Sequence, residues 1–175
     1  MDYSVGHKVV HPSCGAGIIT RIQEKTLGDT VCLYYVIDTA AKGRRLFIPV
    51  DKADEIGIHP VGERSCIEEI LDAPFAALDD ETLGQDHKDR QKVMREQLKS
   101  GDFEIVTDVV RQLCFLSVAR PLGTVDRSLY ELGKELMAAE YALASDVDYK
   151  EGLRQIEDSL SIIVRPVAEE TLAEK

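Results

Sequence analysis

The chain has 175 residues, of which 44% are hydrophobic and 30% are charged, and its formal net charge at pH 7 is −11. This length fits one domain or two small ones, and the composition excludes a disordered or fibrous chain. No apolar run approaches the roughly 20 residues of a membrane-spanning helix, so we expect no membrane partner.

The start of the chain and its cysteines predict the compartment. Residues 1–6 contain no basic segment followed by an apolar one, so we expect no secretory signal. The four cysteines are far apart and form no Cys-x-x-Cys pair. Cys32 and Cys114 lie in apolar runs, which is typical of core thiols in a reducing compartment. We therefore expect a cytoplasmic protein.

The first fifty residues combine short β-rich runs with glycine and proline between them. Such clusters are typical of strands and tight turns. Strands are expected around Val9–Val10, Ile18–Ile19, Val31–Ile37 and Leu46–Ile48, with turns at residues 12–17, 27–29 and 41–43 and a last short strand at Ile56–His59. These strands are too few for a sandwich, so we predict a small SH3- or Tudor-like β-barrel over residues 1–62.

After residue 62 the hydrophobic spacing becomes helical, and we place a domain boundary at this point. Helices are expected from 65 to just before Pro74, from Asp86 or His87 to 99, over 103–119 and 124–144, and from Asp146 or Asp148 to 164. Residues 73–85 are expected to form a loop or a ragged helix, and the tail from Val167 is expected to fray. Short connections predict a compact, antiparallel helical domain over 63–175, hence an α+β protein.

Local signals mark several helix ends. Ser65 and Glu68 have the spacing of a capping box, in which each side chain bonds a backbone N–H of the first turn. Asp102 and Thr124 are expected to cap the helices that follow them. Gly101 suits the left-handed conformation after the preceding helix.

The sequence contains no convincing catalytic or metal-binding motif. His7, His11 and Cys14 invite a zinc interpretation, but His7 and His11 would lie about 13 Å apart on a strand, at roughly 3.3 Å per residue. No third residue orients a cysteine nucleophile, and no glycine-rich phosphate loop is present. We expect no enzyme activity, no cofactor and no metal.

An ordered set of short motifs resembles one known family. The motifs are Val5–Pro12, Gly15–Ile18, Ile48–Val50, Ala53–Asp54 and Ile56–Ile58, followed by Leu98–Asp102 and Val109–Leu113. With their spacing they resemble the CarD/CdnL family of bacterial RNA-polymerase-binding transcription regulators, which shares its polymerase-interacting module with transcription-repair coupling factors. The resemblance covers roughly residues 5–144 and implies docking of the N-terminal barrel on the RNA polymerase β subunit.

The candidate polymerase surface lies on the last strand of the expected barrel. If Leu46 and Ile48 fill the core, alternation leaves Arg45 and Phe47 exposed on the other face. With the facing region of the barrel, the candidate residues are Lys25, Thr26, Arg44, Arg45, Phe47 and Pro49. The alternative is that Phe47 is a core residue and that the basic residues only solubilise the surface.

A second candidate surface lies on the helix expected from residue 87. Lys88, Lys92, Arg95 and Lys99 are separated by four, three and four positions, which places them in one stripe of an α-helix. Such a stripe could contact DNA phosphates, although a solvated helix face is the alternative. The candidate DNA-binding residues are these four, Arg90 beside them, and Arg127 and Lys134, which occupy positions where the family often has basic residues.

His87 is the remaining candidate DNA-binding residue. Many CarD-type proteins have a tryptophan wedge at this position, whereas the chain contains no tryptophan. An imidazole can hydrogen-bond in a groove but offers less surface for propping an unstacked base step.

The distribution of charge limits how DNA could be bound. Residues 1–62 are neutral overall, so residues 63–175 carry the whole net charge of −11. Any contact with promoter DNA must therefore be local, and weak outside a polymerase complex. The favoured hypothesis is a non-catalytic, monomeric regulator that modulates the stability of promoter open complexes. The alternative is a protein-only adaptor that docks on RNA polymerase or another protein and recruits a partner through its acidic helical domain, without DNA contact.

Overall fold

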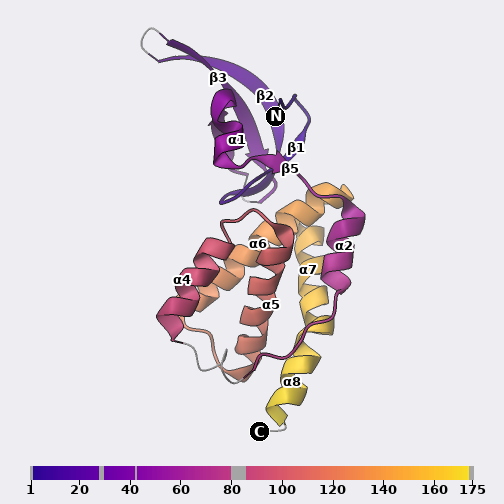
Figure 1. Ribbon diagram of the computed structural model, residues 1–175. Coiled ribbons are helices and arrows are strands. Elements are labelled where there is room, and N and C mark those ends of the chain that lie inside the picture. The colour runs from indigo at the N-terminus through magenta and orange to yellow at the C-terminus, as the bar shows by residue number, and fades with distance from the viewer. Residues whose placement is uncertain (1, 28–29, 42, 80–85, 174–175) are drawn as a thin grey trace.

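A computed structural model describes residues 2–27, 30–41, 43–79 and 86–173 of the protein. A small β-sheet forms one end of an elongated molecule, and a group of helices forms the other (Figure 1). The protein is thus of the α+β class, with the sheet preceding most of the helices.

The sheet is antiparallel, and the part of the chain that the structure describes contributes five strands to it. They are β1 (Lys8–His11), β2 (Gly15–Leu27), β3 (Thr30–Thr39), β4 (Arg45–Pro49) and β5 (His59–Pro60), in the spatial order β4-β3-β2-β1-β5. Within the described residues β4 and β5 are not paired with each other, so the sheet is open. The expectation of a β-barrel is corrected accordingly, because β5 has only two residues and both pair with β1.

The inner face of the sheet holds a small apolar core. It contains Ile19, Tyr35, Ile37 and Ile48, each less than one-tenth exposed. A Cβ atom on Gly17 would meet the Ile37 side chain at 2.6 Å, so only glycine lets β2 and β3 approach here.

The strands β2 and β3 continue past their neighbours as a two-stranded ribbon, which points away from the helices in Figure 1. Ile22, Val31 and Leu33 are 43%, 61% and 47% exposed, and their register places them on one face of this ribbon. The turn predicted at Gly28 and Asp29, and Lys42 of the next turn, lie outside the described residues.

The segment after β4 corrects another expectation. The strand expected over Ile56–His59 is shorter and begins later, as β5 at His59. Before it, Val50–Lys52 form a 3₁₀-helix and Ala53–Ile56 form the short helix α1. Gly57 ends α1 with a φ of +86°, a left-handed conformation that favours glycine. Only then does β5 begin.

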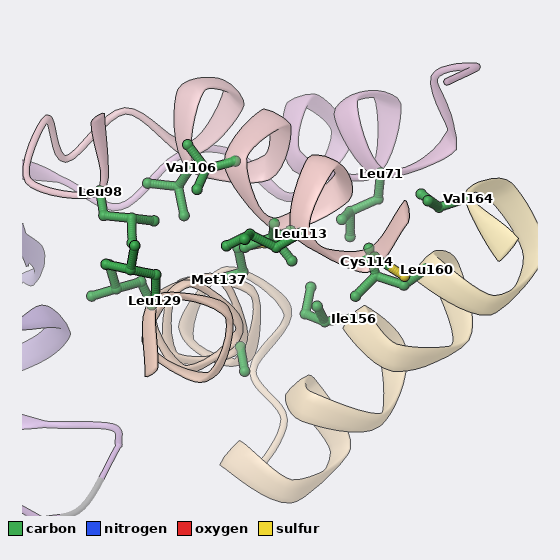
Figure 2. Close-up of a cluster of buried hydrophobic side chains, with 14 of the residues drawn as sticks. Leu71, Leu98, Val106, Leu113, Cys114, Leu129, Met137, Ile156, Leu160 and Val164 are labelled. Carbon is green, nitrogen blue, oxygen red and sulfur yellow. The ribbon is translucent and has the colours of Figure 1, made fainter. Parts of the chain in front are cut away.

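The described residues form six further helices after β5. They are α2 (Arg64–Asp72), α4 (His87–Gln97), α5 (Phe103–Ala119), α6 (Thr124–Ser145), α7 (Tyr149–Ile163) and α8 (Arg165–Ala173). Their main core lies where α5, α6 and α7 meet, and Figure 2 shows Leu113, Met137 and Ile156 pointing toward one another there. Among the described residues, no helix is both long and apolar enough to cross a bilayer.

Aspartates cap two of the helices, at Asp102 as predicted and at Asp148, while two other predicted caps are wrong. The side chains of Asp102 and Asp148 accept bonds from the first-turn amides of α5 and α7. Ser65 lies inside α2, whose first residue Arg64 instead pairs with Glu68 four positions later. Thr124 is the first residue of α6, and that helix has no side-chain cap.

The C-terminal tail is more ordered than predicted. Residues Arg165–Ala173 form α8, which packs on α5 and buries Ala168 completely. Val164 itself is also fully buried, so the apolar spacing of α7 continues into α8.

Candidate functional site: the β4 edge and the α4 stripe

The strand β4 is an edge of the sheet, and its side chains alternate between a buried and an exposed face as predicted. Ile48 is buried and Leu46 is partly buried against the sheet core, whereas Phe47 is 40% exposed. The alternative that Phe47 is a core residue is therefore wrong. Because β4 pairs only with β3 in the described structure, its outer backbone edge is open for another strand.

A cation–π contact organises the exposed face of β4. The Lys25 Nζ atom lies 3.7 Å from the centroid of the Phe47 ring and 5.4 Å from that of Tyr34. Pro49 pairs with Tyr34 across β3 and β4, so it lies at the same part of the sheet. The structure thus brings Lys25, Phe47 and Pro49 together, and adds Tyr34 to them.

Arg45 is exposed but is held by an ion pair. Its Nε atom donates to Asp38 Oδ1 at 2.7 Å, and its Nη2 atom donates to Asp38 Oδ2 at 3.3 Å. These bonds from the guanidinium hold the pKa of the Asp38 carboxyl below its ordinary value. A partner that binds Arg45 must therefore share it with Asp38 or displace that carboxylate.

The other two predicted polymerase-binding residues lie apart from this face. Thr26 pairs with Val31 and follows Lys25 in the strand, so it belongs to the opposite face of the ribbon. Arg44 precedes β4, and its exposed side chain starts from a turn in which its backbone pairs with Thr39.

The basic stripe, defined as Lys88, Lys92, Arg95 and Lys99, is exposed along its whole length. Its first three residues lie on α4, and Lys99 lies just after the helix, where it pairs with Glu96 at 3.2 Å. The Asp86 side chain caps α4 by accepting from the Lys88 amide at 2.7 Å. In Figure 1, α4 lies along one side of the group of helices.

Arg90 lies on the inner side of α4 and is excluded from the proposed DNA contact. Its guanidinium donates to Asp126 of α6 at 2.7 Å, and the two side chains are only 4% and 8% exposed. Gln91 donates to the other Asp126 oxygen at 2.8 Å. The charge that was expected to face DNA therefore attaches α4 to the first turn of α6.

His87 is the first residue of α4 and is exposed beside Lys88. The Arg90 Nη2 atom lies 3.2 Å from His87 Nδ1. Because a guanidinium can only donate, Nδ1 accepts this bond, and the bond fixes the orientation of the imidazole ring.

The two predicted basic residues of α6 differ in their surroundings. Arg127 is exposed, and it follows Asp126 in the turn of α6 that contacts α4. Lys134 is 8% exposed and pairs with Glu131 and with Glu157 of α7. Lys134 is therefore also excluded from the proposed DNA contact, because its ammonium is committed to α7.

The residues considered for metal binding have other partners. His7 Nδ1 accepts from the Ser4 amide and His11 Nδ1 accepts from the Ser13 amide, at 3.2 Å and 3.1 Å. Burial raises the pKa of the Cys14 thiol, which disfavours the thiolate that metals bind. In the part of the chain that the structure describes, no group of three His, Cys, Asp or Glu side chains could hold a metal ion.

Comparison with known proteins identifies the family. Residues 3–62 match the family model described as "CarD-like/TRCF RID domain", and residues 75–157 match that described as "CarD, C-terminal domain". The chain belongs to the CarD family. This confirms the resemblance seen in the motifs.

A relative of known sequence supports the same assignment. The CarD-family chain is 25% identical over 149 residues to a Bacillus subtilis (strain 168) protein named "Putative transcription factor YdeB", covering 85% of this chain and 96% of the relative. CarD proteins are non-catalytic transcription factors, and we assign this protein to the transcription regulators.

Proposed function

We propose that the protein binds the RNA polymerase β subunit through β4 and the face around Phe47. The observation that carries this proposal is the match of residues 3–62 to the CarD-like/TRCF RID domain. The open edge of β4 supports it, because an extended partner segment can add to such an edge by backbone hydrogen bonds. The exposed Phe47 ring beside Lys25 would supply side-chain contacts next to that edge.

The second half of the proposal is that the basic stripe contacts promoter DNA within the polymerase complex and thereby changes open-complex stability. Three exposed cations on one side of α4 and a fourth just after it are suited to phosphate contacts, which position a protein without reading sequence. The net charge of −11 opposes binding to DNA in general. DNA contact would thus depend on the polymerase, which brings the stripe to the promoter.

This function divides the chain into two domains. Residues 1–62 would form the polymerase-binding domain, and residues 63–175 the domain that acts on the promoter. Both would be needed for an effect on transcription, whereas the first alone would be sufficient for polymerase binding.

A second candidate function is a protein-only adaptor. It is favoured by the acidity of residues 63–175, which carry the whole net charge. In that case the helices would bind a protein partner, and the basic stripe would be a solvated surface. Polymerase binding would be unchanged, but the stripe would be dispensable.

The proposal is tested by capture of core RNA polymerase and by the lifetime of open complexes with and without the protein. The double variant Arg45→Glu/Phe47→Asp should weaken polymerase binding at least tenfold, about 1.4 kcal/mol. Lys52→Glu provides a control, because Lys52 is an exposed cation that pairs with Glu55 outside β4. Unchanged affinity of a folded double variant would show that the interface lies elsewhere.

A further inference from the structure

The sheet and the helices meet along α6 in a closely packed apolar contact. Val10, Ala16 and Ala139 of this contact are each less than 5% exposed. A Cβ atom on Gly15 would lie 3.2 Å from the Leu136 side chain, so small residues allow β2 to approach α6 closely. Contacts of this density resist sliding, because each displacement opens a void or creates a clash.

Lys8 crosses the same contact from β1. Its Nζ atom donates to the Leu143 carbonyl oxygen at 2.7 Å and pairs with the Asp146 carboxylate. Both acceptors lie at the C-terminal end of α6, where the helix dipole also favours a cation. The ammonium therefore ties the first strand to the end of α6.

Two more bonds cross the contact on the side of β5. The Gly62 amide donates to Glu140 Oε1 at 3.2 Å, and Glu140 is only 6% exposed. The His59 Nε2 atom lies 3.0 Å from the Gly101 carbonyl oxygen, in the turn between α4 and α5. The contact is thus fastened at several separate points, which excludes rotation about any one of them.

We propose that this contact is a rigid joint, in which Lys8 and Glu140 act as positioning residues that hold the β4 edge at a constant orientation to the basic stripe. The inference rests on the proposed function only for its consequence, namely that docking of the sheet determines where the stripe meets DNA. The joint itself follows from the contacts between β1, β2, β5 and α6.

The helix α6 connects the joint to the stripe. Glu140 and Asp126 are fourteen residues apart on this one helix, about 21 Å at a rise of 1.5 Å per residue. At its far end Asp126 binds Arg90 and Gln91 of α4. A continuous set of packed elements therefore leads from β4 through the sheet and α6 to the stripe.

Residual dipolar couplings of backbone amides test the joint in the full-length protein. A single alignment tensor should fit the amides of the sheet and of the helices together. In Lys8→Ala/Glu140→Ala the two regions should need different tensors, while each remains folded by its own amide shifts. Glu151→Ala/Arg154→Ala, which removes an exposed ion pair on α7, should still fit one tensor. Two tensors in the unaltered protein would overturn the proposal, and so would a single tensor in the folded joint variant.

If the double variant does not fold, the single variant Lys8→Ala tests the joint instead. It should fold, because the Lys8 side chain is 34% exposed and its loss leaves no buried charge. Its couplings should fit one common tensor less well than those of the unaltered protein, and an equal fit would overturn the role of Lys8.

The functional consequence is tested separately. The joint variant should bind polymerase within twofold of the unaltered protein, but change open-complex lifetime at least threefold less. If the unaltered protein does not bind polymerase, the proposed function fails while the couplings still decide the joint. Equal effects on lifetime despite two tensors would show that the orientation of the regions is irrelevant to function.

Discussion

Arg90 and Asp126 form a buried ion pair that joins α4 to α6, with 2.7 Å between Nη2 and Oδ2. Asp126 accepts a second bond from Gln91, so both of its oxygens are satisfied by α4. The helix that carries most of the basic stripe is therefore held against the other helices by this ion pair and by the apolar packing of Met94 and Leu98.

Asp126→Ala should destabilise the protein strongly. It leaves the Arg90 guanidinium buried without its carboxylate, and breaking a buried pair in this way costs about 3–5 kcal/mol. Urea denaturation measures the free energy of unfolding. Glu151→Ala, which breaks the exposed pair with Arg154, is the control and should change it by less than about 1 kcal/mol. Similar values for the two variants would contradict the structural role of Asp126.

Lys88→Glu, Lys92→Glu and Arg95→Glu together should remove the effect on open-complex lifetime and leave polymerase binding intact. All three side chains are exposed, so the change reverses surface charge without disturbing the core. Reversal of Arg120, Lys150 and Arg154 supplies the same charge change at other exposed positions. If the stripe variant acts on open complexes as the unaltered protein does, the adaptor function is favoured instead.

His87→Trp should lengthen open-complex lifetime if residue 87 contacts the DNA at the edge of the melted promoter segment, the transcription bubble. An indole can replace stacking lost at a kinked base step, and about 1 kcal/mol of such stacking corresponds to about a fivefold longer lifetime. His87→Ala should have little effect, because His87 is exposed and its contact to Arg90 is secondary to Asp126. A lifetime unchanged by tryptophan, with polymerase binding preserved, would rule out this role.

Glu140→Gln should change how stability depends on pH. Burial raises the pKa of the Glu140 carboxyl above its ordinary value of 4.5, so the folded protein disfavours the charged form. Its favourable contribution is complete below the unfolded-state pKa and is lost as pH rises through the raised, folded-state pKa. Glutamine keeps an oxygen acceptor for the Gly62 amide and does not ionise.

Urea denaturation at pH 5 and pH 8 measures this difference. The unaltered protein should lose more free energy of unfolding between these values than Glu140→Gln does. Every other ionisable group is present in both proteins, so the comparison isolates Glu140. Equal losses of unfolding free energy in the two proteins would show that the Glu140 carboxyl has the same pKa in the folded and unfolded states.

Local pattern predicted the elements of the two surfaces well, for physical reasons. Alternation along a strand depends only on neighbouring residues, and it placed Ile48 inward and Phe47 outward. The cap of α5 at Asp102 also lies within a few residues of the amide that it bonds.

Long-range partners were not visible in the same way. Arg90 was a candidate DNA-binding residue beside the basic stripe, but in the folded protein it pairs with Asp126, thirty-six positions away. Lys134 was similarly misassigned because its carboxylate partner Glu157 lies on another helix. The open sheet and α8 likewise depend on tertiary packing, which spacing along the chain does not encode.

The ribbon formed by Arg21–Leu27 and Thr30–Leu33 has a consequence for the dynamics of the molecule. Its strands extend beyond the residues that pair with β1 and β4, and its side chains Ile22, Val31 and Leu33 are exposed to water on one face. A two-stranded ribbon is only marginally stable in water, so its amides should exchange hydrogen long before those of Ile19 or Ile37. A partner that covers this face would have to order the ribbon as it binds, and protection of these amides would then report occupancy of the sheet without any label.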